Sequence, residues 1–245
     1  MWYALFRSLF WVLTHLLCRY RVEGRERIPR QGPLLVVANH LVWYDPALMA
    51  IIFPRRLWFM AKIEAFRWPV IGWGARLTEQ ISVRRGASDR VALERALDYL
   101  RQGRAVLIFP EGTVARQGHM LAAHTGAAML ALRAGVPILP IAHTGTRRVF
   151  VGRKAWLPRV EVRIGEPYVP AVPEDVSRKV ALKLVTEDLM RRIALMIPPE
   201  ERGGYAALFE QSEIQPLIKG SREISVSSAT ERATDALPEP PDRAE

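Results

Sequence analysis

Signals for buried strands alternate with signals for helices through the middle of the chain, and this order constrains the fold more than any other feature. Short apolar runs bounded by turn residues lie at 34–38, 57–61, 81–83, 105–109, 138–142 and 160–164. Helical patterns with recognisable starts or stops lie at 47–53, 88–103, 126–133 and 173–196. Strands separated by helices over residues 30–165 predict an α/β domain, with a mixed, largely parallel sheet flanked by helices.

The 245 residues divide into three predicted parts. Residues 1–20 form an N-terminal helix, residues 21–200 hold the α/β domain, and residues 201–245 form a flexible tail. The tail follows Pro198-Pro199 and has too few large apolar residues to build a core. We therefore expect no activity in it.

The N-terminal helix has an uneven distribution of polar residues. Residues 2–18 read WYALFRSLFWVLTHLLC, which is nearly long enough to span a bilayer but contains Arg7 and His15. The polar residues recur close to the helical repeat, so the opposite face presents mainly leucine and phenylalanine. This amphipathic pattern, with tryptophans for the headgroup region and arginines for anionic lipid, predicts a helix lying in the membrane interface. A core helix of a soluble domain and a membrane-spanning helix are the alternatives.

The net charge of +10 suggests an anionic partner. Residues 221–245 carry three arginines and six acidic residues, so residues 1–220 carry +13. Anionic lipid, a phosphorylated substrate and nucleic acid would all fit this charge. The basic residues are scattered and no nucleic-acid-binding motif is present, so we do not expect nucleic acid as a partner.

Cysteine and histidine usage argues against two further classes of site. The single cysteine, Cys18, excludes an intrachain disulfide and a cysteine-based zinc cluster. The five histidines include no closely spaced pair, so no metal site is expected. Residues 66–73 mix tryptophan, phenylalanine and arginine, a composition that fits either a segment dipping into the bilayer or a tryptophan-rich core helix.

His40 and Asp45 follow directly on the predicted strand at 34–38. In α/β proteins sites form where strands end, so a histidine and an aspartate five residues apart can face one cleft. An aspartate bonded to one imidazole nitrogen leaves the other nitrogen free to take a proton from a hydroxyl. As an alternative, Asp45 before Pro46 is a good N-cap for the helix that follows.

Two further motifs stand at strand ends. Residues 109–113, Phe-Pro-Glu-Gly-Thr, follow the strand at 105–109 and could hold hydroxyls or phosphate, although the same residues suit an ordinary turn. Arg84 and Arg85 follow the strand at 81–83 and suit phosphate contacts, although the same residues also suit a basic turn exposed to solvent.

Together these motifs resemble the 1-acylglycerol-3-phosphate O-acyltransferase family, within the wider glycerolipid acyltransferases. The His-x4-Asp pattern falls on His40 and Asp45, and the Phe-Pro-Glu-Gly-Thr block is intact. Residues 136–140, Val-Pro-Ile-Leu-Pro, resemble the fourth family block. The blocks occur in the family's order and spacing, and the resemblance covers roughly residues 20–170.

The resemblance implies a reaction and a site. His40 would act as general base and Asp45 would orient it, so that a free hydroxyl of 1-acylglycerol-3-phosphate attacks the thioester carbonyl of an acyl-CoA or acyl carrier protein. The residues that would bind the glycerol phosphate are Arg85, Glu111, Gly112 and Thr113. The reaction makes phosphatidic acid for phospholipid biosynthesis, needs no cofactor, and would take place on an anionic membrane surface at the cytoplasmic face.

The chain departs from the family pattern at two places. Glu79 stands where the second block usually has glycine, and Val114-Ala115 stand where the third block usually continues Arg-Ser, with Arg116 two positions late. The missing arginine leaves open a different lysolipid acceptor, with a larger headgroup or derived from an amino acid.

Overall fold

The fold is organised around one sheet in the computed structural model, which describes residues 2–84, 89–149, 157–173, 175–209 and 221–225. In these residues seven strands follow the order β1-β7-β6-β2-β5-β3-β4, while β8 pairs with β6 and β9 pairs with β8. The strands are β1 (Arg19–Glu23), β2 (Leu34–Ala38), β3 (Leu57–Lys62), β4 (Ile81–Val83), β5 (Ala105–Ile108), β6 (Ile138–Thr144), β7 (Arg159–Ile164), β8 (Tyr168–Val169) and β9 (Arg222–Glu223).

Most neighbouring strands run parallel. β2 is parallel to both β5 and β6, and β3 is parallel to both β5 and β4. The direction reverses between β6 and β7, which pair antiparallel, and β1 is parallel to β7. The predicted mixed, largely parallel sheet is therefore confirmed.

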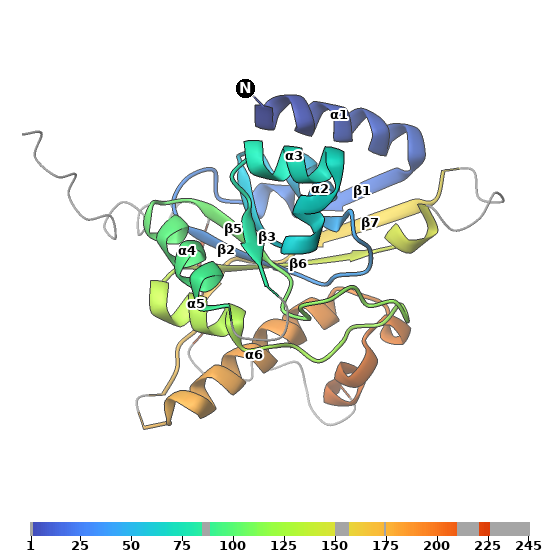
Figure 1. The fold of residues 1–245 in the computed structure, drawn as a ribbon. Helices are drawn as coiled ribbons and strands as arrows, with labels where there is room; N and C mark the ends of the chain where they lie inside the picture. The colour runs from blue at the N-terminus through green and yellow to red at the C-terminus, as the bar shows by residue number, and fades with distance from the viewer. Residues whose placement is uncertain (1, 85–88, 150–156, 174, 210–220, 226–245) are drawn as a thin grey trace, which may run out of the picture.

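Helices cover both faces of the sheet, as Figure 1 shows. One face carries α1 (Trp2–Leu17), α2 (Asp45–Ile52) and α3 (Pro69–Leu77), drawn above the sheet. The other face carries α4 (Arg90–Arg101), α5 (Gly126–Ala134) and α6 (Arg178–Leu195). These two layers of helices explain why the central strands are continuous apolar runs, because a parallel sheet is buried on both sides.

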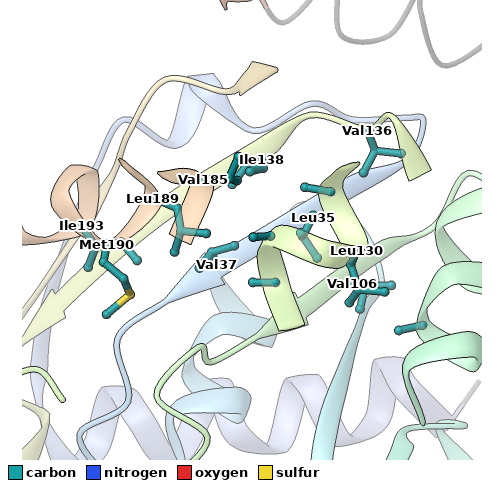
Figure 2. Close-up of a cluster of buried hydrophobic side chains, with 14 of the residues drawn as sticks. Leu35, Val37, Val106, Leu130, Val136, Ile138, Val185, Leu189, Met190 and Ile193 are labelled. Carbon is teal, nitrogen blue, oxygen red and sulfur yellow. The ribbon is translucent and has the colours of Figure 1, made fainter. Parts of the chain in front are cut away.

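The central strand β2 divides its side chains between two cores. Leu35 and Val37 belong to a cluster with residues of α5 and α6, which Figure 2 shows. Leu34 and Val36 belong to a second cluster with residues of α2. All five residues of β2 are fully buried. The residue that follows β2 is thus held at a fixed height and direction by packing on both faces.

Several elements differ from the prediction in position or were not predicted. The helix expected from residue 173 begins at Arg178, where the side chain of Ser177 accepts a hydrogen bond from the Val180 N–H. Strand β1 was not predicted, because its sequence RYRVE is mostly charged and half-exposed. It is placed mainly by pairing with β7, and its side chains Tyr20 and Val22 pack partly buried against the core.

For the segment at 66–73 the sequence allowed either an irregular segment that dips into the bilayer or a tryptophan-rich core helix. A 3-10 helix (Ile63–Arg67) leads into α3, which begins at Pro69. Trp68 and Trp73 are about half exposed, so this segment is not a core helix. Trp68 meets Trp43 edge to face, and Trp73 meets Trp2 in the same way.

Helix α1 lies on α2 and α3 with Arg7 turned toward the protein. Arg7 donates hydrogen bonds to the backbone oxygens of Ala50, Ile51 and Phe53, at and just beyond the end of α2. The outward face is mainly apolar, with Leu5 57% exposed and Leu16 68% exposed, and it also carries the exposed Ser8 and His15. In the described part of the chain, no helix is both long and apolar enough to cross a membrane.

Part of the predicted flexible tail is structured. Residues Gly203–Phe209 form a 3-10 helix, and the Tyr205 hydroxyl accepts a hydrogen bond from the Ala123 N–H. Strand β9 pairs with β8, and the neighbouring Ile224 is buried. Short apolar anchors within a polar segment account for this difference, while residues 226–245 lie outside the described part.

Candidate active site

The parallel register brings four strand ends to one edge of the sheet. His40 follows β2, Glu111 follows β5, Lys62 ends β3, and His143 lies near the end of β6. β6, β2, β5 and β3 are consecutive neighbours in the sheet. The carboxyl ends of such strands form the usual site of an α/β fold.

His40 and Asp45 form a hydrogen-bonded pair at this edge. The His40 Nδ1 atom lies 2.9 Å from Asp45 Oδ2. The same oxygen accepts the backbone N–H groups of Leu41 and Val42, at 2.7 and 2.8 Å. The Asp45 carboxylate is fully buried, so one oxygen holds both the imidazole and the loop that carries it.

The alternative role for Asp45 as a helix N-cap is wrong. Helix α2 begins at Asp45 itself, its N-cap is Tyr44, and no side chain caps it. The Asp45 side chain turns back to the preceding loop, while Pro46 provides a helix start that needs no N–H partner.

The His40 ring is fixed in orientation yet open to the surface. It stacks on Phe109, with ring centroids 4.1 Å apart and planes inclined by 19°. Its side chain is 14% exposed. Since Nδ1 faces a carboxylate, Nδ1 carries a proton, and Nε2 is left with the lone pair that can accept a proton from a hydroxyl.

The carboxylate of Glu111 is hydrogen-bonded to backbone N–H groups and is buried. Its Oε1 accepts the His40 N–H at 3.0 Å, and its Oε2 accepts the Leu121 N–H at 2.8 Å. Burial raises the pKa of Glu111 to about 7, with the charge of Asp45 acting in the same direction and the two backbone hydrogen bonds acting against it. Glu111 was expected to bind substrate, and the structure shows it joining the His40 loop to the loop after β5.

Gly112 and Thr113 form the exposed rim of that loop. Gly112 has φ +65°, and a Cβ atom there would lie 3.0 Å from Cδ2 of His124. The Thr113 hydroxyl accepts a hydrogen bond from Nζ of Lys62 at 3.3 Å. Lys62 was not predicted as a site residue, although its position at the end of a strand next to β5 could have indicated it.

The arginines after β4 are only partly described. The Arg84 N–H donates to Asp89, which also caps α4, and the Arg84 side chain lies in an exposed position. Arg85, the residue expected to bind phosphate, lies outside the described residues.

A cavity of about 260 Å³ opens beside the His40 loop. It is bounded by α1, α2, α3 and β3, and nearly all of its surface is apolar. Trp43, Tyr44 and Pro46, which lie between His40 and the body of α2, form part of its wall. The cavity can therefore hold apolar groups beside the loop that follows His40. Among the described residues no three histidine, cysteine or acidic side chains are grouped to hold a metal ion.

A comparison with protein families finds the family described as Acyltransferase, which matches residues 19–144, just over half of the chain. The chain belongs to the acyltransferase family. The matched region runs from β1 to β6 and contains both the His40–Asp45 pair and the Glu111 loop.

Individual relatives in this family have two kinds of name. The chain is 40% identical over 123 residues to a lyso-ornithine lipid O-acyltransferase of Pseudomonas aeruginosa, covering 50% of this chain and 46% of the relative. It is 30% identical over 135 residues to a 1-acyl-sn-glycerol-3-phosphate acyltransferase of Borreliella burgdorferi, covering 53% of each. The chain thus matches these curated relatives over about half of their length.

One solved structure shows the same fold. The 1-acyl-sn-glycerophosphate acyltransferase of Thermotoga maritima aligns over 87% of this chain and 81% of its own, with a TM-score of 0.61 and 24% identity. At this identity the likeness concerns the fold.

Glu111→Gln should change how the stability of the protein depends on pH. Because the folded chain raises the pKa of Glu111, the contribution of this group is fully present below about pH 4.5 and is lost as the pH rises through about 7. The variant lacks the titrating group and presents an NH₂ to one of the two N–H donors, so it should be less stable at low pH. The gap in melting temperature between wild type and variant should narrow as the pH rises from about 4.5 to about 8.

Calorimetry of both proteins across this range measures the gap. The control is Glu64→Gln, at an exposed position, which should leave the pH dependence unchanged. If the difference in melting temperature between wild type and Glu111→Gln stays constant over this range, the raised pKa of Glu111 is contradicted.

Proposed function

We propose that the protein transfers a fatty acyl group from a thioester to the free hydroxyl of a lysolipid, with 1-acylglycerol-3-phosphate as the acceptor. The observation that carries this proposal is the His40–Asp45 pair beside the apolar cavity. A general base that is held by a buried carboxylate suits removal of a proton from an alcohol. The adjoining hydrocarbon-sized space suits the acyl chain.

The reaction needs one base and no covalent intermediate. Nε2 of His40 takes the proton of the acceptor hydroxyl as the oxygen attacks the thioester carbonyl, and Asp45 stabilises the imidazolium that forms. The C–S bond then breaks, and the leaving thiolate takes the proton back from Nε2. Cys18 plays no part, because it is buried in the core and burial raises the pKa of its thiol.

The acceptor headgroup would lie against the loop after β5. Lys62 and Thr113 provide a cation and a hydroxyl beside each other, and Gly112 leaves the backbone uncovered. Together with Arg85, these residues are proposed to form the surroundings of the acceptor phosphate, while Glu111 is proposed to contribute by holding the backbone of the loop. Relatives named as 1-acyl-sn-glycerol-3-phosphate acyltransferases support this acceptor.

A lyso-ornithine lipid is the second candidate acceptor. Two relatives with this name are 40% and 42% identical to the chain over the matched regions. The family arginine expected after Thr113 is replaced by Val114, and a single lysine can pair with the carboxylate of an amino-acid-derived headgroup. Acyl-CoA and acyl carrier protein are both proposed as donors, since each presents the same kind of thioester, and no cofactor is needed.

The site is proposed to work on the cytoplasmic face of a membrane. The outward residues of α1 are apolar, and Trp43, Trp68 and Trp73 are each about half exposed on elements that surround the cavity. Tryptophan and leucine on one surface of a basic domain suit binding to an interface of anionic lipid. Such binding would bring lipid acceptors and acyl chains to the cavity without passage through water.

His40→Gln should lower acyl transfer by about 1,000-fold or more with little change in melting temperature, because the base is lost while Phe109 still covers the position. Asp45→Asn should also reduce transfer strongly, since an amide cannot stabilise the imidazolium. Mass spectrometry of products from acyl-CoA and acyl carrier protein donors, with 1-acylglycerol-3-phosphate and lyso-ornithine lipid tested in parallel, measures both rate and acceptor.

A folded His40→Gln protein with near-wild-type rates would refute the general-base assignment. A wild type active only on lyso-ornithine lipid would replace the first acceptor by the second. A wild type inactive with every donor and acceptor would refute the proposed function.

Ala47→Phe should shift donor preference toward short acyl chains, because the new ring fills part of the cavity that Ala47 lines. Each methylene excluded from apolar surroundings costs about 0.8 kcal/mol, so the ratio of kcat/KM for a sixteen-carbon over an eight-carbon donor should fall about tenfold or more once two methylenes are excluded. Ala4→Phe is the matched control, since Ala4 is exposed on α1 away from the cavity. An unchanged ratio in Ala47→Phe would place the acyl chain elsewhere.

Replacing both Leu5 and Leu16 by glutamine should weaken binding to vesicles containing phosphatidylglycerol by about tenfold or more, because two exposed leucines lose their burial in lipid. Cosedimentation measures the partition coefficient. Val91→Gln is the control, since Val91 is 79% exposed on α4, on the opposite face of the sheet. Equal loss in the control, or no loss in the double variant, would argue against α1 as the membrane-binding element.

A further inference from the structure

His143 lies behind the His40–Asp45 pair in a network of buried polar groups. Strand β6 runs beside β2, and the Asn39 side chain extends this pairing by one step. Asn39 Nδ2 donates to the His143 backbone oxygen at 2.9 Å, and Asn39 Oδ1 accepts the His143 N–H at 2.9 Å. Both side chains are buried, so the end of β6 is attached firmly to the residue before His40.

The His143 ring faces two acceptors with one nitrogen. Its Nε2 atom lies 2.8 Å from the Asn39 backbone oxygen and 3.5 Å from Asp45 Oδ2. Since neither oxygen can donate, Nε2 carries a hydrogen. On the other side Nδ1 lies 3.4 Å from the Thr146 hydroxyl, which can donate to it. These contacts place a hydrogen on Nε2, directed at the Asn39 and Asp45 oxygens.

We propose that His143 is a positioning residue for the His40–Asp45 pair, because its Nε2–H, which is hydrogen-bonded to the Asn39 backbone oxygen, also faces the Asp45 carboxylate at 3.5 Å. This inference rests on the proposed acyl transfer, because its role is to keep Asp45 directed at the general base. His143 itself is fully buried and touches no substrate.

The hydrogen bonds of Asp45 explain why a further contact from His143 matters for the orientation of the carboxylate. Among the described residues Oδ1 of Asp45 is buried and has no hydrogen-bond partner. The carboxylate is therefore oriented through Oδ2 alone, which meets two backbone N–H groups, Nδ1 of His40 and Nε2 of His143. A displacement of the carboxylate from this orientation would weaken several contacts together.

The other titratable groups around the pair are Glu111 and Tyr44. Glu111 acts on the His40 backbone, and the Tyr44 hydroxyl donates to the Thr146 backbone oxygen, with burial raising its pKa. Nε2 of His143 lies 3.5 Å from Oδ2 of Asp45. Removing the His143 N–H leaves more of the Asp45 charge to stabilise a protonated His40.

The test compares His143→Leu with His143→Gln. Leucine keeps much of the volume and removes the donor, while glutamine can present an N–H near the position of Nε2. His143→Leu should lower kcat by about 10-fold or more with an unchanged KM, and His143→Gln should retain kcat within about threefold of wild type. Melting temperatures identify the folded proteins, and kinetics are compared only below the transition.

A second measurement is independent of catalysis. The titration midpoint of the His40 imidazole, followed by NMR of protein labelled in histidine and assigned with His40→Gln, should rise in His143→Leu and stay near wild type in His143→Gln. A purely structural role of His143 would change the melting temperature and leave this midpoint unchanged. The shift therefore tests positioning even if the wild type fails to acylate any acceptor, an outcome that would refute the proposed function and not this inference.

Three results would overturn the inference. The first is a folded His143→Leu protein with wild-type kcat and an unmoved His40 midpoint. The second is an equal loss in both variants, which would show that the Nε2–H is not the group that matters. The third is failure of both variants to fold. If only His143→Leu fails to fold, His143→Gln decides: a retained kcat and midpoint support the inference, and their loss overturns it.

Discussion

The Oδ2 atom of Asp45 is the interaction on which the arrangement of the site depends. It meets the His40 ring and the N–H groups of Leu41 and Val42, so one buried oxygen shapes the loop and orients the imidazole together. A buried carboxylate is costly unless it is hydrogen-bonded, and the bonds of Oδ2 are made to the imidazole and to the backbone of the loop that carries it. The stability of the loop and the orientation of the His40 ring thus depend on the same oxygen, so a substitution that affects one also affects the other.

The sheet makes this concentration of contacts possible. β2 is buried on both faces and is parallel to β5 and β6, so the residues that follow these strands meet without long loops. Glu111 then joins the loop after β5 to His40, and Asn39 joins the end of β6 to it. Both neighbouring strands are thus tied to the backbone at the end of β2, one through the Glu111 side chain and the other through the Asn39 side chain. The register of the sheet therefore controls the position of the His40 imidazole.

Much of this was predictable from the sequence, and the exceptions share a physical cause. The buried strands and the His40–Asp45 pair follow from apolar runs and from motifs that depend on short spacing. The roles of Glu111 and His143 depend on contacts between residues 71 and 104 positions apart, which local patterns do not encode. β1 was missed for a related reason, because its place depends on β7, more than a hundred residues later. Asp45 also looked suited to cap α2, and its hydrogen bonds in the folded chain decide between the two roles.

Helix α1 was predicted to have one more polar face, and the structure divides the polar residues of that face. Arg7 is directed inward to the backbone oxygens at the end of α2, whereas Ser8 and His15 are exposed. These oxygens would otherwise lie partly buried without donors, so the arginine stabilises the contact between α1 and α2. The leucines are consequently left outside, next to the cavity walls formed by α1, α2 and α3. The contact between Arg7 and the end of α2 therefore leaves the exposed leucines, the apolar cavity and the His40 loop on one side of the molecule.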